Sequence, residues 1–512
     1  MQAQKAEGTR DLIGAEMRAW QKMQQIAAGV FEPFGFKPIE TPAIEQVDVF
    51  VHGIGQSTDV VRKEMFRVFS GANLERVFTE GTDTKLKPKQ RLALRPEGTA
   101  GVVRSVVENN LVPQGSTPFK AYYAEAMFRG ERPQKGRLRQ FHQVGVEWLG
   151  ASDPAADAEC IIMLMEFYKR LGFDLSKLRL LINSMGDAQC RPAYREQVKQ
   201  FILDHADEMC DECRERAELN PLRAFDCKND HCREIMADAP LMGDNLCDEC
   251  REHYEQVKRY LDVAGIEYVE DPTLVRGLDY YTRTVFEVEA PGAGVGSIGG
   301  GGRYDGLVEL EGGKPTAGVG FAVGFERALL ALQAFGSDLG ADETPCVYVA
   351  NAGKELRQNV FAITQELRAA GIVTEADYQG RSLKAQFKQA DKVGAKLILV
   401  LGGDELVAGK VKVRDMQGLD RGLHIGDGGR HQGRQADELC TCLAHGLYDT
   451  LGVNVAPEVE HVIAVIFEDD TDNVLADVVH VALDGGQHDA ALAGAALALF
   501  GDGGLDLLKG AL

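Results

Sequence analysis

The chain has 512 residues, is 45% hydrophobic and carries a formal net charge of −22. This length exceeds what one hydrophobic core serves, so we expect about three or four domains. No run approaches the roughly 18 apolar residues of a membrane span, and the first residues lack the apolar core of a signal peptide, which argues against a membrane protein and predicts a soluble, cytosolic one.

The first predicted element is a helix over residues 15–31. Its apolar positions recur at helical spacing and share one face: Trp20, Met23, Ala27 and Val30. An extended segment follows, interrupted by Pro38 and Pro42. Because proline cannot donate a hydrogen bond to a neighbouring strand, this segment belongs at a sheet edge or at an interface.

Residues 92–108 predict a short strand, a turn and a helix, with Glu97 and Thr99 in the first helical turn. Acidic and hydroxyl side chains at that position most often cap the helix. The residues alone therefore favour a cap over a ligand-binding role.

Residues 118–149 predict two antiparallel strands joined by a long basic loop. The loop turns at Pro133 and Gly136, and its basic side chains are Arg129, Arg132, Lys135, Arg137 and Arg139. Guanidinium groups held on a rigid strand suit the oxygens of nucleotide phosphates, and Phe141 is placed to offer a flat face to a base. A solvated, charged surface hairpin explains the same residues about equally well.

From about residue 186 to residue 257 charge becomes dense and apolar periodicity weakens, which predicts an inserted helical subdomain. Two Cys-x2-Cys pairs within it have the spacing of a structural zinc site: Cys210, Cys213, Cys247 and Cys250. Cys227, His231 and Cys232 lie between the two pairs. Because disulfides are rare in the cytosol, the alternatives are a zinc ion held by the two pairs or buried free thiols.

Three later segments combine glycine with charged or aromatic residues. Residues 274–290 place Arg276, Asp279, Tyr280 and Tyr281 ahead of an alternating strand. The run Gly299–Gly302 precedes Arg303, Tyr304 and Asp305, and a glycine cluster by itself usually marks a tight turn. Residues 317–332 predict a strand that runs into a helix with Arg327 near its start.

After a linker-like stretch at residues 336–343, strands alternate with helices, which predicts a small α/β domain with a largely parallel sheet over residues 344–427. The extension at residues 428–512 is rich in Ala, Gly and Asp and has 14 acidic residues against three basic ones. About half of the net negative charge therefore lies in this extension, and local basic patches can persist elsewhere. We predict no role for the extension.

The basic hairpin, FRGERPQKGRLRQFHQVGVE at residues 128–147, closely resembles the second signature motif of class II aminoacyl-tRNA synthetases, specifically of the histidyl-tRNA synthetase family. The segments around Pro42 and Arg327 resemble the first and third class II motifs, and RPEGTAG, LVRGLDYYTR and GGGGRYDGL are similar to other motifs of the family. The resemblance implies an α+β fold, with an antiparallel sheet flanked by helices. It divides the chain into a catalytic domain at 1–336 with the helical insertion at 186–257, an anticodon-binding α/β domain at 344–427, and the 428–512 extension, for which the family has no counterpart.

The resemblance implies a homodimeric, bacterial-type enzyme that activates histidine with ATP and magnesium and transfers it to the 3′ end of its tRNA. Arg276 and Arg129 would be catalytic. The residues implied for ATP are Arg129, Glu131, Arg137, Phe141 and Arg327. Those implied for histidine are Glu97, Thr99, Gln143, Glu147, Arg276, Tyr280 and Tyr281. Arg132 and Gln134 would lie near the acceptor end of the tRNA.

Two alternatives stand beside this interpretation. A catalytically idle paralogue that senses histidine as a regulatory subunit would bind without ligating, but such paralogues typically lose the nucleotide-binding arginines or the anticodon domain. A general RNA-binding module with a basic hairpin would not explain the pairing of Glu147 with Tyr281, nor the separate glycine motif.

Overall fold

The computed structural model describes residues 3–55, 58–80, 86–113, 117–337, 339–340, 346–407 and 411–416. The chain divides into two units, Met1–Asp342 and Glu343–Leu512, which are described separately. The 428–512 extension lies outside the described residues. Among the helices that the structure describes, none has the length and apolar content needed to cross a membrane.

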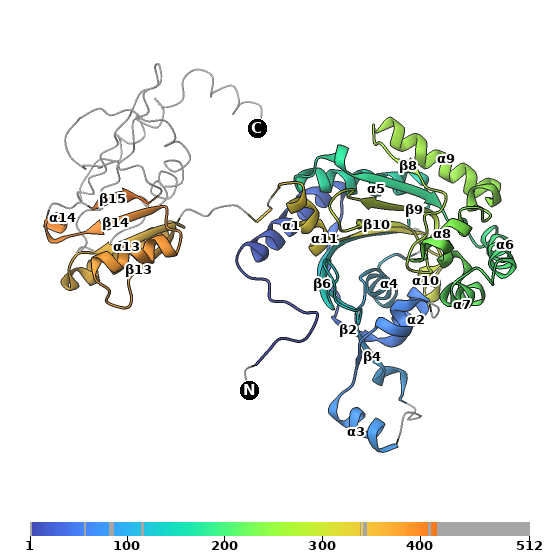
Figure 1. Ribbon diagram of the computed structural model, residues 1–512, viewed down its shortest axis with the longest axis horizontal. Helices are drawn as coiled ribbons and strands as arrows, with labels where there is room; N and C mark the ends of the chain where they lie inside the picture. The colour runs from blue at the N-terminus through green and yellow to red at the C-terminus, as the bar shows by residue number, and fades with distance from the viewer. Residues whose placement is uncertain are drawn as a thin grey trace. The chain divides into compact units, whose positions relative to one another are not determined.

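An eight-stranded sheet organises the first unit (Figure 1). Its strands, in spatial order, are β1 (Lys37–Pro38), β5 (Phe119–Phe128), β6 (Gln140–Leu149), β11 (Gly318–Gly324), β10 (Ser297–Arg303), β9 (Thr282–Glu289), β7 (Arg179–Ser184) and β8 (Val269–Glu270). The six strands from β5 to β7 in this order pair antiparallel with one another, whereas the edge strands β1 and β8 pair in parallel with β5 and β7. This confirms the predicted α+β class, including the basic hairpin between β5 and β6.

Two glycines of the sheet, Gly145 in β6 and Gly301 in β10, are required by close approach rather than by turns. A Cβ on Gly145 would lie 2.4 Å from the Tyr123 hydroxyl oxygen, and one on Gly301 would lie 2.0 Å from the backbone oxygen of Gly320. The run Gly299–Gly302 does not form the tight turn that glycine clusters usually mark, because it lies inside β10. The absent side chains let the strands and the tyrosine pack against one another.

Helices cover both faces of the sheet (Figure 1). One layer contains α1 (Ala15–Phe31), α5 (Pro154–Arg170) and α11 (Phe325–Ala334), and the other contains α4 (Thr99–Glu108). The predicted helix is confirmed as α1, which buries the predicted apolar face. Because successive strand residues face opposite sides, Tyr122 packs in the α1 layer while Tyr123 packs in the α4 layer.

A smaller sheet and short helices complete the frame beside α4. The sheet has the order β2-β4-β3, with β2 (Ile44–Gln46), β4 (Leu92–Leu94) and β3 (Arg67–Val68). The helices are α2 (Val47–Ile54), α3 (Gly71–Glu80) and α10 (Leu307–Leu310).

The insertion leaves the sheet after β7 and returns at β8. It consists of α6 (Arg191–Asp204), α7 (Asp211–Leu219), the 3-10 turn η5 (Pro221–Asp226), α8 (Asp230–Met236), the 3-10 turn η6 (Met242–Asn245) and α9 (Asp248–Val263). Its core merges with the α4 layer through buried cysteines, methionines and Tyr281. The insertion therefore packs against the segment that enters β9.

The second unit contains a four-stranded sheet with the order β13-β12-β14-β15. Its strands are β12 (Cys346–Asn351), β13 (Val373–Ala376), β14 (Leu397–Leu401) and β15 (Lys412–Asp415), and its helices are α12 (Arg357–Ala369), α13 (Leu383–Lys392) and α14 (Gly403–Val407). The first three strands are parallel and β15 is antiparallel, as the alternating pattern predicts.

Candidate active site

A cleft of about 990 Å³ opens between the sheet and the insertion. Its walls include most of the residues singled out in the sequence: Glu97, Thr99, Arg129, Glu131, Gln134, Arg137, Phe141, Gln143, Arg276, Tyr280, Tyr281 and Arg327. Glu147 and Arg132 do not line it. A volume near 1,000 Å³ suits a nucleotide together with a small second substrate.

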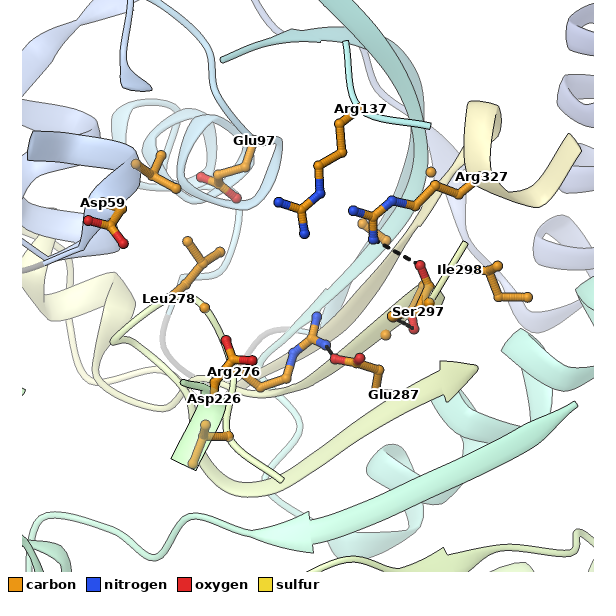
Figure 2. Close-up of a pocket in the computed structure, with 18 of the residues that line it drawn as sticks. Asp59, Glu97, Arg137, Asp226, Arg276, Leu278, Glu287, Ser297, Ile298 and Arg327 are labelled. Carbon is orange, nitrogen blue, oxygen red and sulfur yellow. Dashed lines mark hydrogen bonds and ion pairs between the residues drawn. The ribbon is translucent and has the colours of Figure 1, made fainter. Parts of the chain in front are cut away.

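Four of the arginines that line this cleft, from three distant segments of the chain, are those singled out in the sequence. Arg129 and Arg137 belong to the β5–β6 loop, Arg276 precedes β9, and Arg327 lies in the first turn of α11. Figure 2 shows the side chains of Arg137, Arg276 and Arg327 pointing toward one another. Arg327 is held by α11, and the loops that carry the other three arginines are anchored at their ends in β5, β6 and β9, so the guanidinium groups are arranged before any ligand arrives.

The described acidic groups beside these arginines neutralise them only in part. Glu131 accepts from Nη1 of Arg137 at 3.3 Å, and Glu287 pairs with Nη1 of Arg276. Arg327 instead donates to the backbone oxygen of Ser297 at 3.0 Å. Burial, together with the positive charge of Arg137, lowers the pKa of Arg327. Such a cluster of mutually repelling cations is stabilised by a multiply charged anion.

Arg129 also lies beside the ring of Phe141. Its guanidinium carbon lies 5.2 Å from the centre of the Phe141 ring, and its Nε donates to the backbone oxygen of Pro96 at 2.9 Å. These contacts hold a cation and an aromatic face side by side in the cleft wall.

Glu147 lies behind the cleft wall and is 1% exposed. Its Oε1 accepts from Thr99 Oγ1 at 2.7 Å and from the Tyr123 hydroxyl at 3.3 Å, and its Oε2 accepts from the Tyr304 hydroxyl at 2.5 Å. Burial raises the pKa of Glu147 to about 8, although the hydrogen bonds from Tyr304 and Thr99 oppose that shift. A carboxyl group that titrates near neutral pH thus lies directly behind three residues that do line the cleft: Thr99, Tyr123 and Tyr304.

Glu97 has the cap geometry that its position in the sequence favours. Its carboxylate accepts from the backbone N–H of Thr99 at 2.7 Å and of Ala100 at 2.9 Å, at the start of α4. Burial raises the pKa of Glu97 despite these hydrogen bonds. Glu97 also lines the cleft, so the cap and a ligand-binding role are compatible.

Two buried polar atoms of the cleft have no hydrogen-bond partner among the described residues: Oε1 of Gln143 and Nε of Arg276. Tyr280 and Tyr281 pack with ring centres 4.6 Å apart beside them. Unpaired buried donors and acceptors are costly, so a ligand that supplies their partners would be favoured.

The two loop residues suggested for tRNA separate in the structure. Gln134 lines the cleft, whereas Arg132 is exposed and outside its wall. Both belong to the β5–β6 loop, but backbone hydrogen bonds between Gln134 and Arg137 close a turn that begins at Gln134, two residues after Arg132.

Sequence reasoning missed the partners that hold this site together. In the sequence, Tyr123 is one residue of a predicted alternating strand and Tyr304 is one residue of the glycine motif, and neither pattern indicates that they donate hydrogen bonds to Glu147. Glu287, the partner of Arg276, is one of two acids in β9. Arg303 is fully buried and pairs with the equally buried Asp157 at 2.6 Å, which indicates a structural role behind the cleft.

The predicted zinc ligand set is not the one that the structure brings together. Cys210 and Cys213 lie with Cys227 and Cys232, whereas Cys247 and Cys250 lie with Asp187 and Cys190. The correction has a simple cause: each Cys-x2-Cys pair heads a different helix of the insertion, α7 or α9. Sequence spacing alone does not show where those helices pack.

Comparison with known proteins gives consistent results for both units. The family described as histidyl-tRNA synthetase matches residues 8–328, and the anticodon binding domain family matches residues 346–427. The histidine–tRNA ligase of Desulforamulus reducens is 45% identical over 413 residues, covering 80% of this chain and 94% of the relative. That of Pelotomaculum thermopropionicum is 45% identical over 410 residues, covering 80% and 92%.

A crystal structure of apo S. aureus histidyl-tRNA synthetase has a TM-score of 0.65 to this chain at 34% identity. The similarity covers 81% of this chain and 95% of that one.

Proposed function

Because this chain belongs to the histidyl-tRNA synthetase family, we propose how the residues of its cleft divide the work of the family's reaction. The chain is an ATP-dependent histidine–tRNA ligase. It activates histidine with ATP to histidyl-adenylate and pyrophosphate, and then transfers histidine to the 3′ end of its tRNA. Magnesium accompanies the ATP.

The first step must bring the histidine carboxylate onto the α-phosphorus of ATP, so two anions have to meet. We assign Arg129 to the α-phosphate, Arg137 and Arg327 to the outer phosphates, and Phe141 to stacking on adenine. Arg276 would bridge the histidine carboxylate and the α-phosphate, stabilising the charge that grows there in the transition state. Glu131 would orient Arg137 and also contact ATP. The convergence of four arginines in one cleft supports this assignment.

Selection of histidine requires partners for an imidazole with one donor and one acceptor nitrogen. We assign these roles to Glu147 and Tyr281, with Tyr280 packed alongside. Contact with Glu147 requires the imidazole to reach past Thr99 and Tyr123, so one hydroxyl would give up its hydrogen bond to Oε1. Its longer hydrogen bond, 3.3 Å, makes Tyr123 the group we expect to yield.

The α-amino group of histidine would be held by Glu97, Thr99 and Gln143. The unpaired, buried Oε1 of Gln143 supports this role, because an ammonium group supplies the donors that it lacks. Amino acids without an imidazole would leave buried polar groups unsatisfied, at about 1 to 3 kcal/mol each. Discrimination of this kind needs no editing site.

The remaining parts of the proposal concern the partners. Residues 1–336 would be the catalytic domain and residues 344–427 would bind the anticodon, while Arg132 and Gln134 would approach the acceptor end. We propose that the enzyme works in the cytosol as a homodimer, with the segment around Pro42 at the subunit interface. We also propose a structural role for zinc in the insertion.

The alternative of a catalytically idle regulatory subunit is disfavoured, since all four arginines and a second unit are present.

Charging of tRNA tests the proposed function directly. With ATP, magnesium and histidine, we expect the full chain to attach radiolabelled histidine to histidine tRNA and to no other tRNA of the same cell extract. Acid-precipitable counts on purified tRNAs measure this. Tight histidine binding without charging would instead support the regulatory alternative.

A further inference from the structure

The insertion contains the same four-residue sequence twice, Cys-Asp-Glu-Cys at 210–213 and at 247–250. Each copy begins a helix. Cys210 is the N-cap of α7 with φ/ψ of −67°/158°, and Cys247 is the N-cap of α9 with φ/ψ of −64°/163°. In both copies the two cysteines therefore lie in the first turn of a helix.

Each copy meets a different pair of additional donors. The first lies with Cys227 and Cys232, and within this group all four sulfur atoms are within 4.8 Å of one another. Cys210 Sγ is 3.8 Å from Cys227 Sγ, and the backbone N–H of Cys210 donates to Cys232 Sγ at 3.3 Å. A tetrahedral zinc ion with Zn–S bonds of about 2.3 Å separates its sulfurs by about 3.8 Å.

The second copy lies with Asp187 and Cys190, again with all four donor atoms within 4.8 Å. Cys190 Sγ is 3.9 Å from Cys250 Sγ. Asp187 pairs with Arg283 at 3.3 Å, the kind of outer contact that orients a ligating carboxylate. This group therefore offers three thiols and a carboxylate.

We propose that the insertion binds two zinc ions, one at Cys210, Cys213, Cys227 and Cys232, and one at Asp187, Cys190, Cys247 and Cys250. Both sets fit the coordination number and donor types of closed, structural zinc sites. The insertion's core combines these cysteines with methionines, alanines and a few larger apolar side chains, so the ions would add cross-links to its hydrophobic packing.

The two ions would also brace the segment that carries Arg276 and Tyr281. Arg223, in the turn leading to Cys227, donates to the backbone oxygen of Arg276 at 3.3 Å. Arg191, next to Cys190, donates to the backbone oxygen of Tyr281 at 2.5 Å. Arg223 and Arg191 are thus positioning residues, each held close to one of the proposed metal sites.

Metal content tests the proposal without reference to activity. The full chain, purified under reducing conditions without added metal, is expected to contain two zinc ions by plasma mass spectrometry. Cys227→Ser and Cys250→Ser should each lower the content to one. The control Cys160→Ala, a buried free cysteine outside both groups, should keep both ions. A wild-type content near zero or of one ion, or two ions retained in Cys227→Ser, would overturn the proposal.

Cobalt substitution is a second test, and because it uses the wild-type protein it does not depend on any variant folding correctly. Wild-type protein loaded with cobalt should show sulfur-to-cobalt charge-transfer absorption and the visible bands of tetrahedral cobalt, whereas octahedral spectra would contradict the donor sets.

The bracing role predicts that folded Cys227→Ser raises the KM for histidine about tenfold. If metal binds but the chain fails to activate histidine, the proposed function falls and the zinc sites stand.

Discussion

Replacing Arg276 with alanine is expected to lower the rate of histidine-dependent ATP–pyrophosphate exchange by about 10²- to 10³-fold, the usual cost of losing a donor that stabilises transition-state charge. The structure prepares Arg276 for this role, because Glu287 fixes one end of its guanidinium while its buried Nε has no partner among the described residues. The main loss should fall on kcat, since the contact with the α-phosphate strengthens as the bond to histidine forms.

A measurement of histidine binding distinguishes the loss of transition-state stabilisation by Arg276 from a general loss of structure in the variant. Isothermal titration should show that Arg276→Ala still binds histidine measurably, and Arg276→Lys should recover part of the exchange rate because it restores a cation without the fork geometry. Arg170→Ala is a matched control, since Arg170 is exposed on α5 and pairs with Glu166. Exchange at the wild-type rate in Arg276→Ala would contradict the assignment.

Glu147→Gln is expected to raise the KM for histidine about 10- to 100-fold, because a buried imidazole N–H left without an acceptor costs about 1 to 3 kcal/mol. The substitution replaces a carboxyl by an amide that cannot ionise and whose N–H₂ presents donors toward the imidazole N–H. The KM for ATP should hardly change, because the arginine cluster is untouched. A variant with native histidine KM would show that Glu147 serves the fold alone.

The pH dependence of stability provides the internal control for Glu147. A carboxyl group whose pKa rises from 4.5 to about 8 on folding binds its proton more tightly in the folded state. It therefore stabilises the fold at low pH, and that stabilisation is lost as pH rises from about 4.5 to about 8. Thermal unfolding without histidine should lose less stability over this range in Glu147→Gln than in wild type, and equal slopes would show that the carboxyl is not buried as described.

Several helices and strands of this protein could be predicted because the sequence patterns that indicate them are local. The helical spacing over residues 15–31 and the alternation on either side of the basic loop are read within a few residues, and they correspond to α1 and to the β5–β6 hairpin. The run Gly299–Gly302 carries no such clear signal, because glycine permits both turns and close strand approach. Only the neighbour across the sheet, Gly320, decides between them.

The site could be predicted less completely, since its details depend on contacts between distant segments. No spacing rule shows that Tyr123 and Tyr304 would share a carboxyl group with Thr99, nor that Glu147 would lie behind the cleft wall. The cysteines illustrate the same limit. Their pairwise spacing indicates metal binding, but which pairs meet depends on how α7 and α9 pack.

The central claim is that one cleft combines a receptor for a triphosphate with a slot for an imidazole. ATP–pyrophosphate exchange, measured with the full chain and each of the twenty amino acids in turn, tests it most directly. We predict exchange with histidine and rates at background for the other nineteen. Comparable exchange with another amino acid, or none with histidine in the presence of ATP and magnesium, would contradict it.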